Sequence, residues 1–106
     1  MIEMYEDVTK LVREEIKRAN KVNPPFHSGH EAYGVMEEEI REVIKELAKV
    51  ITCHEVLFER TMADDGNNSD AILTGIRHAK LMACEAIQVA AMFVKYGESN
   101  GMGRTW

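Results

Sequence analysis

The residues with the clearest capacity for chemistry are glutamates that repeat at helical spacing in two parts of the chain. Glu39, Glu42 and Glu46 follow one another at steps of three and four, and a later segment carries Glu85 and Gln88 three residues apart. Residues at these spacings share one face of a helix. Carboxylate and amide oxygens are the hard ligands that Mg²⁺ and Mn²⁺ prefer. Two such helices side by side would gather these oxygens around a divalent cation.

Two interpretations of the first group of glutamates remain open. Like charges at these spacings destabilise a helix by only a few tenths of a kcal/mol per pair, so a solvated acidic surface tolerates them. On a helical wheel, a neighbouring face alternates acids and bases and is expected to be an ion-paired solvent face. That face holds Glu37, Glu38, Arg41, Lys45 and Lys49. The wheel places none of these bases within the ridge of Glu39, Glu42 and Glu46, which favours a metal site there.

Glu85 stands in the most apolar part of the chain. Between Ala79 and Val94 only Lys80, Glu85 and Gln88 are polar. A helix that is apolar nearly all round is buried on more than one side, so we expect it to pack on its own chain and on a partner. An ionised carboxylate there would cost several kcal/mol unless it is paired or bound to a metal. An ion pair with Lys or Arg remains an alternative for Glu85.

Helical periodicity predicts the elements that must position these residues. Apolar side chains recur at steps of three and four over Ile2–Lys21, and Pro24–Pro25 ends that helix. Ser28 with Glu31 three residues later is typical of a capping box and predicts a second helix that runs to about Arg60.

A third helix is expected after the polar segment Met62–Asp70, which reads as a loop. Ser69 or Asp70 would cap this helix, and it would end near Tyr96–Gly97. The sequence thus predicts an all-α domain over residues 1–96, a long-helix hairpin plus an N-terminal helix, which completes a four-helix-type bundle by oligomerisation. Residues 97–106 are expected to form a flexible tail, in preference to a nucleobase stacked on Trp106 and Arg104.

Composition excludes several classes of protein. The chain has 106 residues, room for one small domain, and 18 acidic against 13 basic residues give a net charge of −5, which argues against binding of duplex nucleic acid. No apolar run approaches the roughly 20 residues of a membrane span, and the acidic N-terminal segment is unlike a secretory signal. Two cysteines are too few for a disulfide scaffold. We therefore expect a cytoplasmic protein.

Other metal centres fit the sequence less well. A di-iron carboxylate bundle needs Glu-x-x-His pairs, but Ile51 and Gly75 stand three residues before His54 and His78. The cysteines and histidines show no zinc-type spacing, and the segment around Asp65 lacks the glycine and the closing glutamate of a calcium loop.

At its acidic segments the sequence resembles the MazG-like, all-α nucleoside triphosphate pyrophosphohydrolases, and most closely the short phage and prophage members. The run Glu38-Glu39-Ile40-Arg41-Glu42 matches that family's EExxE motif, and Glu85-Ala86-Ile87-Gln88 matches its ExxD motif at Glu85. Gln88 stands where the family has aspartate. The resemblance covers about Phe26–Tyr96.

The resemblance implies an enzyme that cleaves a nucleoside triphosphate to the monophosphate and pyrophosphate with Mg²⁺, or with Mn²⁺ in its place. It also implies a homodimer or homotetramer. Glu39, Glu42, Glu85 and Gln88 are the expected metal ligands. Glu46 or Glu38 would orient the attacking water, and Arg77 and Lys95 would contact phosphates unless they simply face solvent. Because an amide at position 88 removes one negative charge, a catalytically inactive helical oligomerisation or binding module is the alternative function.

Overall fold

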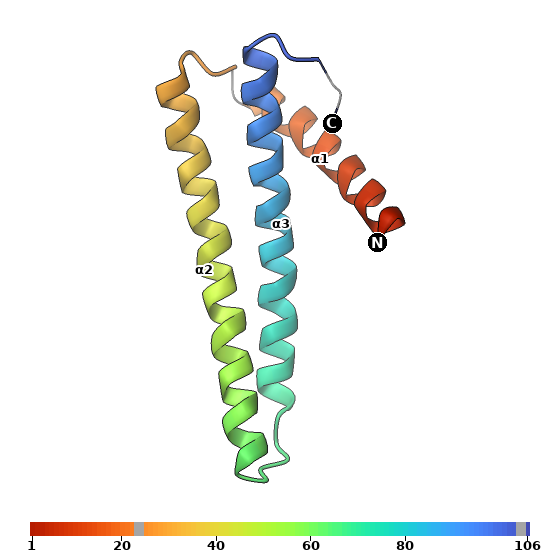
Figure 1. Cartoon of the computed structure of the whole chain (residues 1–106), viewed down its shortest axis with the longest axis vertical. Helices are drawn as coiled ribbons and strands as arrows, with labels where there is room; N and C mark the ends of the chain where they lie inside the picture. Colours follow the sequence, from red (N-terminus) through yellow and green to blue (C-terminus); the bar gives the residue numbers. More distant parts are fainter. Residues whose placement is uncertain (23–24, 104–105) are drawn as a thin grey trace. The chain divides into compact units, whose positions relative to one another are not determined.

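The structure, a computed structural model, describes residues 1–22, 25–103 and 106, and the regular secondary structure in these ranges is entirely α-helical (Figure 1). Helix α1 spans Ile2–Val22, α2 spans Gly29–Met62 and α3 spans Ser69–Ser99. The all-α prediction is confirmed. Two positions named in the sequence analysis lie outside the described residues. They are Pro24, where the first helix was expected to stop, and Arg104 of the C-terminal segment. No helix in the described ranges is long and apolar enough to cross a membrane.

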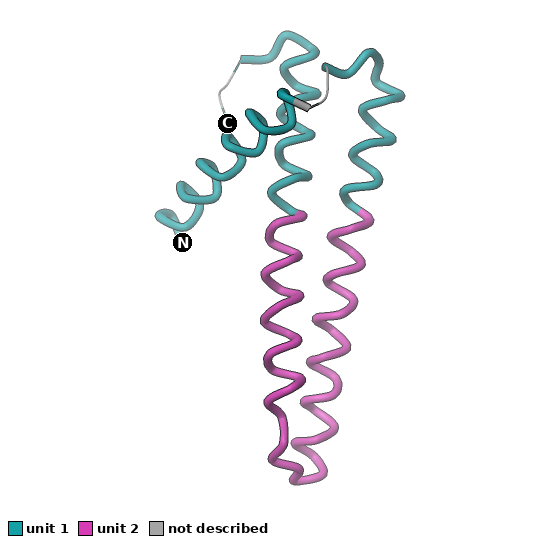
Figure 2. The backbone as a smooth tube through the Cα atoms, turned by 180° about the vertical axis from the view of Figure 1, so that it is seen from behind, with its two compact units in different colours: residues 1–40, 86–106 teal, residues 41–85 magenta. Residues whose placement is uncertain are grey.

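The chain divides into two compact units, coloured separately in Figure 2. Unit 1 comprises residues 1–40 and 86–106, and unit 2 comprises residues 41–85. Each unit therefore contains part of α2 and part of α3, and α1 belongs to unit 1.

The core of unit 1 forms where α1 packs on α3. Val12 and Ile16, four residues apart on α1, are 5% and 2% exposed, and they pack with the fully buried Ala91 of α3. Ile87 and Ala90 of α3 add to this cluster. The small side chain at position 91 lets the two helices approach closely, so that the branched chains of α1 fill the space between them.

The start of α2 follows the predicted capping box with one shift. The amide of Glu31 donates to the hydroxyl of Ser28 at 3.1 Å, as expected. The Glu31 carboxylate accepts from the amide of His27 at 3.4 Å, one residue before the expected partner. Two amides at the start of this helix thus find side-chain acceptors.

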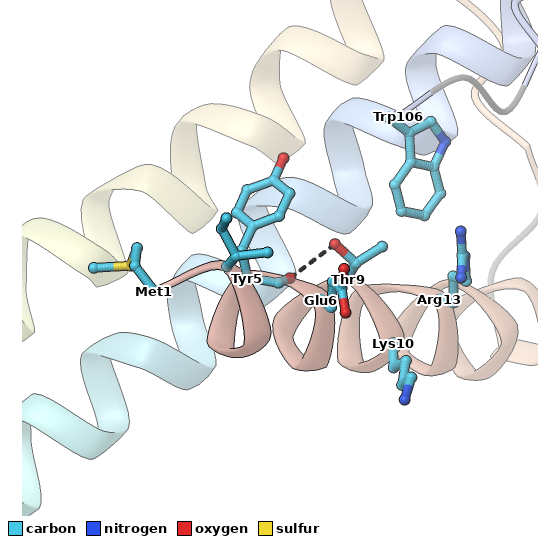
Figure 3. Close-up of a pocket in the computed structure, with 8 residues that line it drawn as sticks. Met1, Tyr5, Glu6, Thr9, Lys10, Arg13 and Trp106 are labelled. Carbon is cyan, nitrogen blue, oxygen red and sulfur yellow. Dashed lines mark hydrogen bonds between the residues drawn. The ribbon is translucent and has the colours of Figure 1, made fainter.

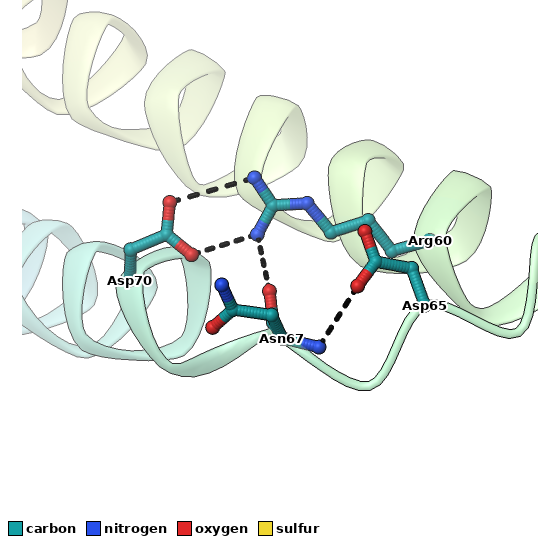
Figure 4. A network of polar contacts seen from close by, with 4 residues as sticks. All are labelled: Arg60, Asp65, Asn67 and Asp70. Carbon is teal, nitrogen blue, oxygen red and sulfur yellow. Dashed lines mark hydrogen bonds and ion pairs between the residues drawn. The ribbon is translucent and has the colours of Figure 1, made fainter.

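Unit 2 is a helical hairpin whose loop, residues 63–68, is held at both ends. The guanidinium of Arg60 donates to both carboxylate oxygens of Asp70, at 2.7 and 3.4 Å, and to the carbonyl of Asn67 at 3.0 Å (Figure 4). This bonding by Arg60 lowers the pKa of Asp70. Asp70 thereby binds Arg60 near the end of α2. The N-cap of α3 is Asn68, one residue earlier than predicted.

The end of α2 is closed by an aspartate in a left-handed conformation. Asp64 has a φ of 54°, its amide donates to the carbonyl of Thr61, and the next amide, of Asp65, donates to the carbonyl of Arg60. These two bonds define a Schellman motif, in which glycine is the preferred residue at the position of Asp64. Helix α2 therefore continues to Met62, two residues beyond the predicted end.

Replacement of Asp64 by glycine is expected to stabilise the protein by about 0.5–1 kcal/mol, because the strain of a left-handed non-glycine residue is removed. Urea denaturation followed by circular dichroism measures this change. Asp65→Gly, at the adjacent position without positive φ, is the matched control and should not stabilise. A loss of stability in Asp64→Gly would contradict the expectation.

Helix α3 also ends later than predicted, at Ser99 instead of near Gly97. Gly101 has a φ of 77° and supplies the left-handed residue, and the amide of Met102 donates to the carbonyl of Gly97. Gly97 lies within α3, where an added Cβ would come within 3.3 Å of the Met102 sulfur. The later glycine of the two therefore ends the helix, because it alone adopts the left-handed conformation.

Candidate functional site

A short polar contact between α2 and α3 in unit 2 joins Glu46 to His78. The Glu46 Oε2 and His78 Nδ1 atoms lie 2.6 Å apart, and the two side chains are only 12% and 16% exposed. Lys49, one turn along α2, approaches the Glu46 carboxylate at 3.5 Å. Hydrogen bonding to His78, together with the nearby charge of Lys49, holds the pKa of Glu46 below its usual value.

His78 was not predicted as a functional residue, and the periodicity of the two helices contains the signal that identifies it. Val43, Glu46, Val50 and Cys53 recur at steps of three and four on α2 and are all partly buried. His78 belongs to the corresponding buried stripe of α3. The members of that stripe recur at the same steps and are partly or fully buried: Ala71, Gly75, His78 and Met82. A histidine and a glutamate on the facing stripes of one hairpin are candidates for a pair.

Stability should therefore fall on acidification in a way that depends on Glu46. A carboxyl group whose pKa is lowered by folding stabilises the native state above its unfolded pKa of about 4.5, and this contribution is lost as the pH falls through the lower folded value. We expect the melting temperature of the parent protein to drop more between pH 5.5 and pH 3 than that of Glu46→Gln. Glu55→Gln, on the same helix, is the control. Equal drops in melting temperature for the parent protein and Glu46→Gln would refute the dependence on Glu46.

Two contacts fix the register of α2 against α3 in unit 2. One is the Glu46–His78 contact, and the other is the close approach at Gly75, where an added Cβ would lie 3.6 Å from the Cβ of Cys53. Counted from these contacts at about 1.5 Å per residue, Glu42 and Glu85 come level with each other within about 5 Å along the hairpin. Two predicted ligands of unit 2 are thus brought to one level from two helices.

Unit 1 has a comparable register for the other two predicted ligands. A Cβ added at Gly29 would lie 3.1 Å from the hydroxyl of Tyr96, which marks where α2 and α3 face each other. From there Glu39 and Gln88 are ten and eight residues along their helices, which puts both in the same part of the α2–α3 contact of unit 1. Both side chains are partly buried and both interact with neighbouring groups, as does Glu85 in unit 2.

Two lysines contact members of the glutamate ridge, although the helical wheel places no base within it. The Lys45 ammonium lies 3.8 Å from the carboxylate of Glu42, and Lys49 lies 3.5 Å from that of Glu46. Each lysine is three residues after its glutamate, and its long side chain bends back from the flanking face onto the ridge. The Lys45–Glu42 pair is 62% and 49% exposed, so water and salt weaken it and leave Glu42 available to a cation.

The remaining predicted residues differ in their exposure to solvent and belong to different units. Glu38 is exposed on α2 in unit 1, and Arg77 is exposed on α3 in unit 2. Lys95, in unit 1, is only 6% exposed, and its ammonium lies 4.7 Å from the centre of the Phe26 ring. A cation over an aromatic face is stabilised by the ring's electrons, which gives Lys95 a structural partner in addition to its predicted role.

A shallow hollow of about 290 Å³ opens beside His78 in unit 2. It is lined by Lys49, Thr52, Cys53 and Thr74, together with His78 itself. The exposed lining of this hollow is mostly apolar, and the imidazole of His78 borders it with Nδ1 directed at Glu46. Such a dyad is the arrangement that general-base histidines use.

The acidic side chains that the structure describes do not form a metal centre by themselves. Within residues 1–22, 25–103 and 106, no group of three or more His, Cys, Asp or Glu side chains is arranged to hold a metal ion. Mg²⁺, however, is commonly held by one or two carboxylates, with substrate phosphates and water filling its other positions. Glu42 and Glu85 are oxygen donors of that kind and number.

Comparison with known proteins gives one family match. Residues 2–61 match the family model described as FYRC, F/Y rich C-terminus, which covers α1 and α2 up to Thr61. No curated protein and no solved structure matches the chain.

Proposed function

This chain belongs to the FYRC (F/Y-rich C-terminus) family, and we propose that it is a Mg²⁺-dependent nucleoside triphosphate pyrophosphohydrolase. The family match ends at residue 61 and does not include α3, which carries Glu85. The observation that carries the proposal is the register of unit 2, which brings Glu42 of α2 level with Glu85 of α3. The similarity of both segments to the MazG-like motifs supports the same chemistry.

Glu42 and Glu85 of unit 2 would hold the metal ion, whereas Glu39 and Gln88, the other two predicted ligands, belong to unit 1. When bound, the ion neutralises charge on the phosphates and polarises the phosphorus under attack. Arg77 is exposed on α3 and able to contact a phosphate oxygen. Lys95 is the other proposed phosphate contact. Its ammonium would have to leave its position over the Phe26 ring to bind a phosphate oxygen.

His78 and Glu46 supply a route for the proton of the attacking water. A neutral imidazole whose Nδ1–H is held by the Glu46 carboxylate presents its Nε2 as an acceptor. This nitrogen would take the proton of the water while Glu46 orients the ring and stabilises the positive charge that forms on it. Glu38, exposed on α2, is the other proposed water-orienting residue.

Pyrophosphate release tests the proposal. The protein is incubated with each of the common ribo- and deoxyribonucleoside triphosphates and Mg²⁺, and pyrophosphate is measured with and without EDTA. We expect release from at least one nucleotide, abolished by EDTA and restored by Mg²⁺ or Mn²⁺. No release above the uncatalysed rate from any nucleotide with either metal would overturn the proposal.

An inactive helical module that assembles with a second copy is the other candidate function, and one observation favours it. Ile44, Leu47 and Ile51 of α2 recur at steps of three and four, and they are 58%, 42% and 48% exposed. On α3 of the same unit, Ile72 and Ile76 are 47% and 51% exposed. Apolar stripes with this spacing are typical of helices that pack against further helices, as a homodimer or homotetramer requires.

Sedimentation and thermal melts separate the two candidates. Ile51→Lys should lower the sedimenting mass to that of one chain, whereas Thr52→Lys, at the next exposed position, should not. An assembling protein whose melting temperature is no higher with nucleotide and Mg²⁺ than with nucleotide and EDTA would be an inactive module, because a metal ion bound to the folded state raises that temperature. A single-chain mass in the parent protein would contradict assembly.

A further inference from the structure

An open hollow of about 630 Å³ in unit 1 lies along α1, with Trp106 lining one end (Figure 3). Its volume is in the range of pockets that hold small molecules. Trp106 lies opposite Arg13, whose guanidinium carbon is 5.6 Å from the centre of the indole ring. The last residue of the described chain thus has a defined place on the first helix.

Two aromatic side chains stand on the same side of α1 around this hollow. Figure 3 shows the ring of Tyr5 projecting from α1 and the ring of Trp106 directed toward α1 from the C-terminal segment, with Thr9 between them along the helix. Tyr5 is 68% exposed and Trp106 is 37% exposed, so each ring still presents a face. Planar aromatic ligands of many kinds stack on such faces, because each has a π-face.

Charge is distributed unevenly along the hollow. Arg13 points toward Trp106, whereas Lys10 points to the other side of α1, and Glu6 lies nearer to Tyr5 (Figure 3). A guanidinium binds phosphate oxygens in a fork of parallel hydrogen bonds. The end beside Arg13 therefore suits an anion, and the carboxylate of Glu6 suits a hydrogen-bond donor such as the amino group of a base.

We propose that this hollow binds a nucleotide, with the base against Tyr5 and Trp106 and the phosphate at Arg13. The choice of a nucleotide among aromatic anions rests on the proposed function. Binding itself needs neither the metal nor hydrolysis, so the proposal is tested separately from catalysis.

The only tryptophan of the chain is part of the hollow, so its fluorescence reports occupancy directly. The full chain is titrated with AMP in the presence of EDTA, which prevents metal-dependent hydrolysis. We expect saturable quenching of the Trp106 emission by AMP, at least tenfold weaker binding of adenosine, and no quenching by inorganic phosphate. This pattern requires both the ring and the anion in one ligand.

Matched variants assign the binding to the named side chains. Tyr5→Ala should weaken AMP binding at least tenfold, whereas Tyr33→Ala, which removes an equally exposed tyrosine (68%) from α2, should leave it unchanged. Arg13→Gln should weaken AMP binding and leave adenosine binding unaffected. Equal binding of AMP and adenosine in the parent protein, or equal effects of the two tyrosine variants, would overturn the proposal.

Further outcomes separate this inference from the proposed function. Quenching by AMP without pyrophosphate release would support the binding site and overturn only the enzyme. Quenching by N-acetyltyrosinamide and not by AMP would show that the hollow receives an aromatic peptide side chain, and the nucleotide proposal would fall. The absence of any saturable quenching up to millimolar AMP would also overturn it.

Discussion

Glu85→Gln is expected to lower the rate of pyrophosphate release about 100-fold or more while the helical content and melting temperature stay close to those of the parent. The amide has the shape of the carboxylate but lacks its charge, so it holds a divalent cation more weakly. A hundredfold loss corresponds to about 2.7 kcal/mol of transition-state stabilisation. Pyrophosphate release at saturating Mg²⁺ measures the effect, and an excess of Mn²⁺ should recover part of the activity because Mn²⁺ binds the same oxygen ligands.

Glu55→Gln is the control for this change. Glu55 is an exposed glutamate of α2 in the same unit, away from the facing stripes of the hairpin. Its replacement should leave the rate within about twofold of the parent, since surface charges contribute little. Equal activity in Glu85→Gln and Glu55→Gln would remove Glu85 from the proposed metal site.

Ile16→Ala is expected to destabilise the protein by about 2–5 kcal/mol, the largest effect on stability that we predict. Ile16 is 2% exposed and packs with Val12 and Ala91 where α1 meets α3. The truncation removes apolar contacts and leaves a cavity, because backbone and neighbours close such a space only in part. Urea denaturation followed by circular dichroism measures the change in the free energy of unfolding.

Ile2→Ala is the matched control, because it removes the same atoms from the same helix at a position that is 77% exposed. Its effect should stay within about 0.5 kcal/mol. A similar loss in the two variants would show that the packing of α1 on α3 does not hold unit 1 together.

The sequence predicted the helices well because the signals that start and stop them are local. The steps of three and four between apolar residues predicted all three helices, and Ser28 with Glu31 marked the start of α2. The helix ends were less accurate. Asp64 and Gly101 close α2 and α3 by adopting a left-handed conformation, and composition alone does not show which residue of a polar loop does so.

The candidate site was predicted only in part. The acidic residues were identified from their spacing within one helix, but their surroundings depend on the other helix. Lys45 and Lys49 reach the glutamate ridge through flexible side chains that a helical wheel does not represent. His78 meets Glu46 across a separation of 32 residues, so periodicity places each of them on a buried stripe but does not show that the two meet.

The sequence by itself determined three helices, their approximate limits and the positions of the carboxylates, because hydrogen bonding and capping within a helix involve residues no more than a few positions apart. Tertiary structure alone decided that Glu46 pairs with His78, that Glu42 comes level with Glu85, and that Trp106 lies over Arg13. Each of these depends on the register or docking of segments distant in sequence, which is set by the packing of side chains such as Gly75 and Cys53.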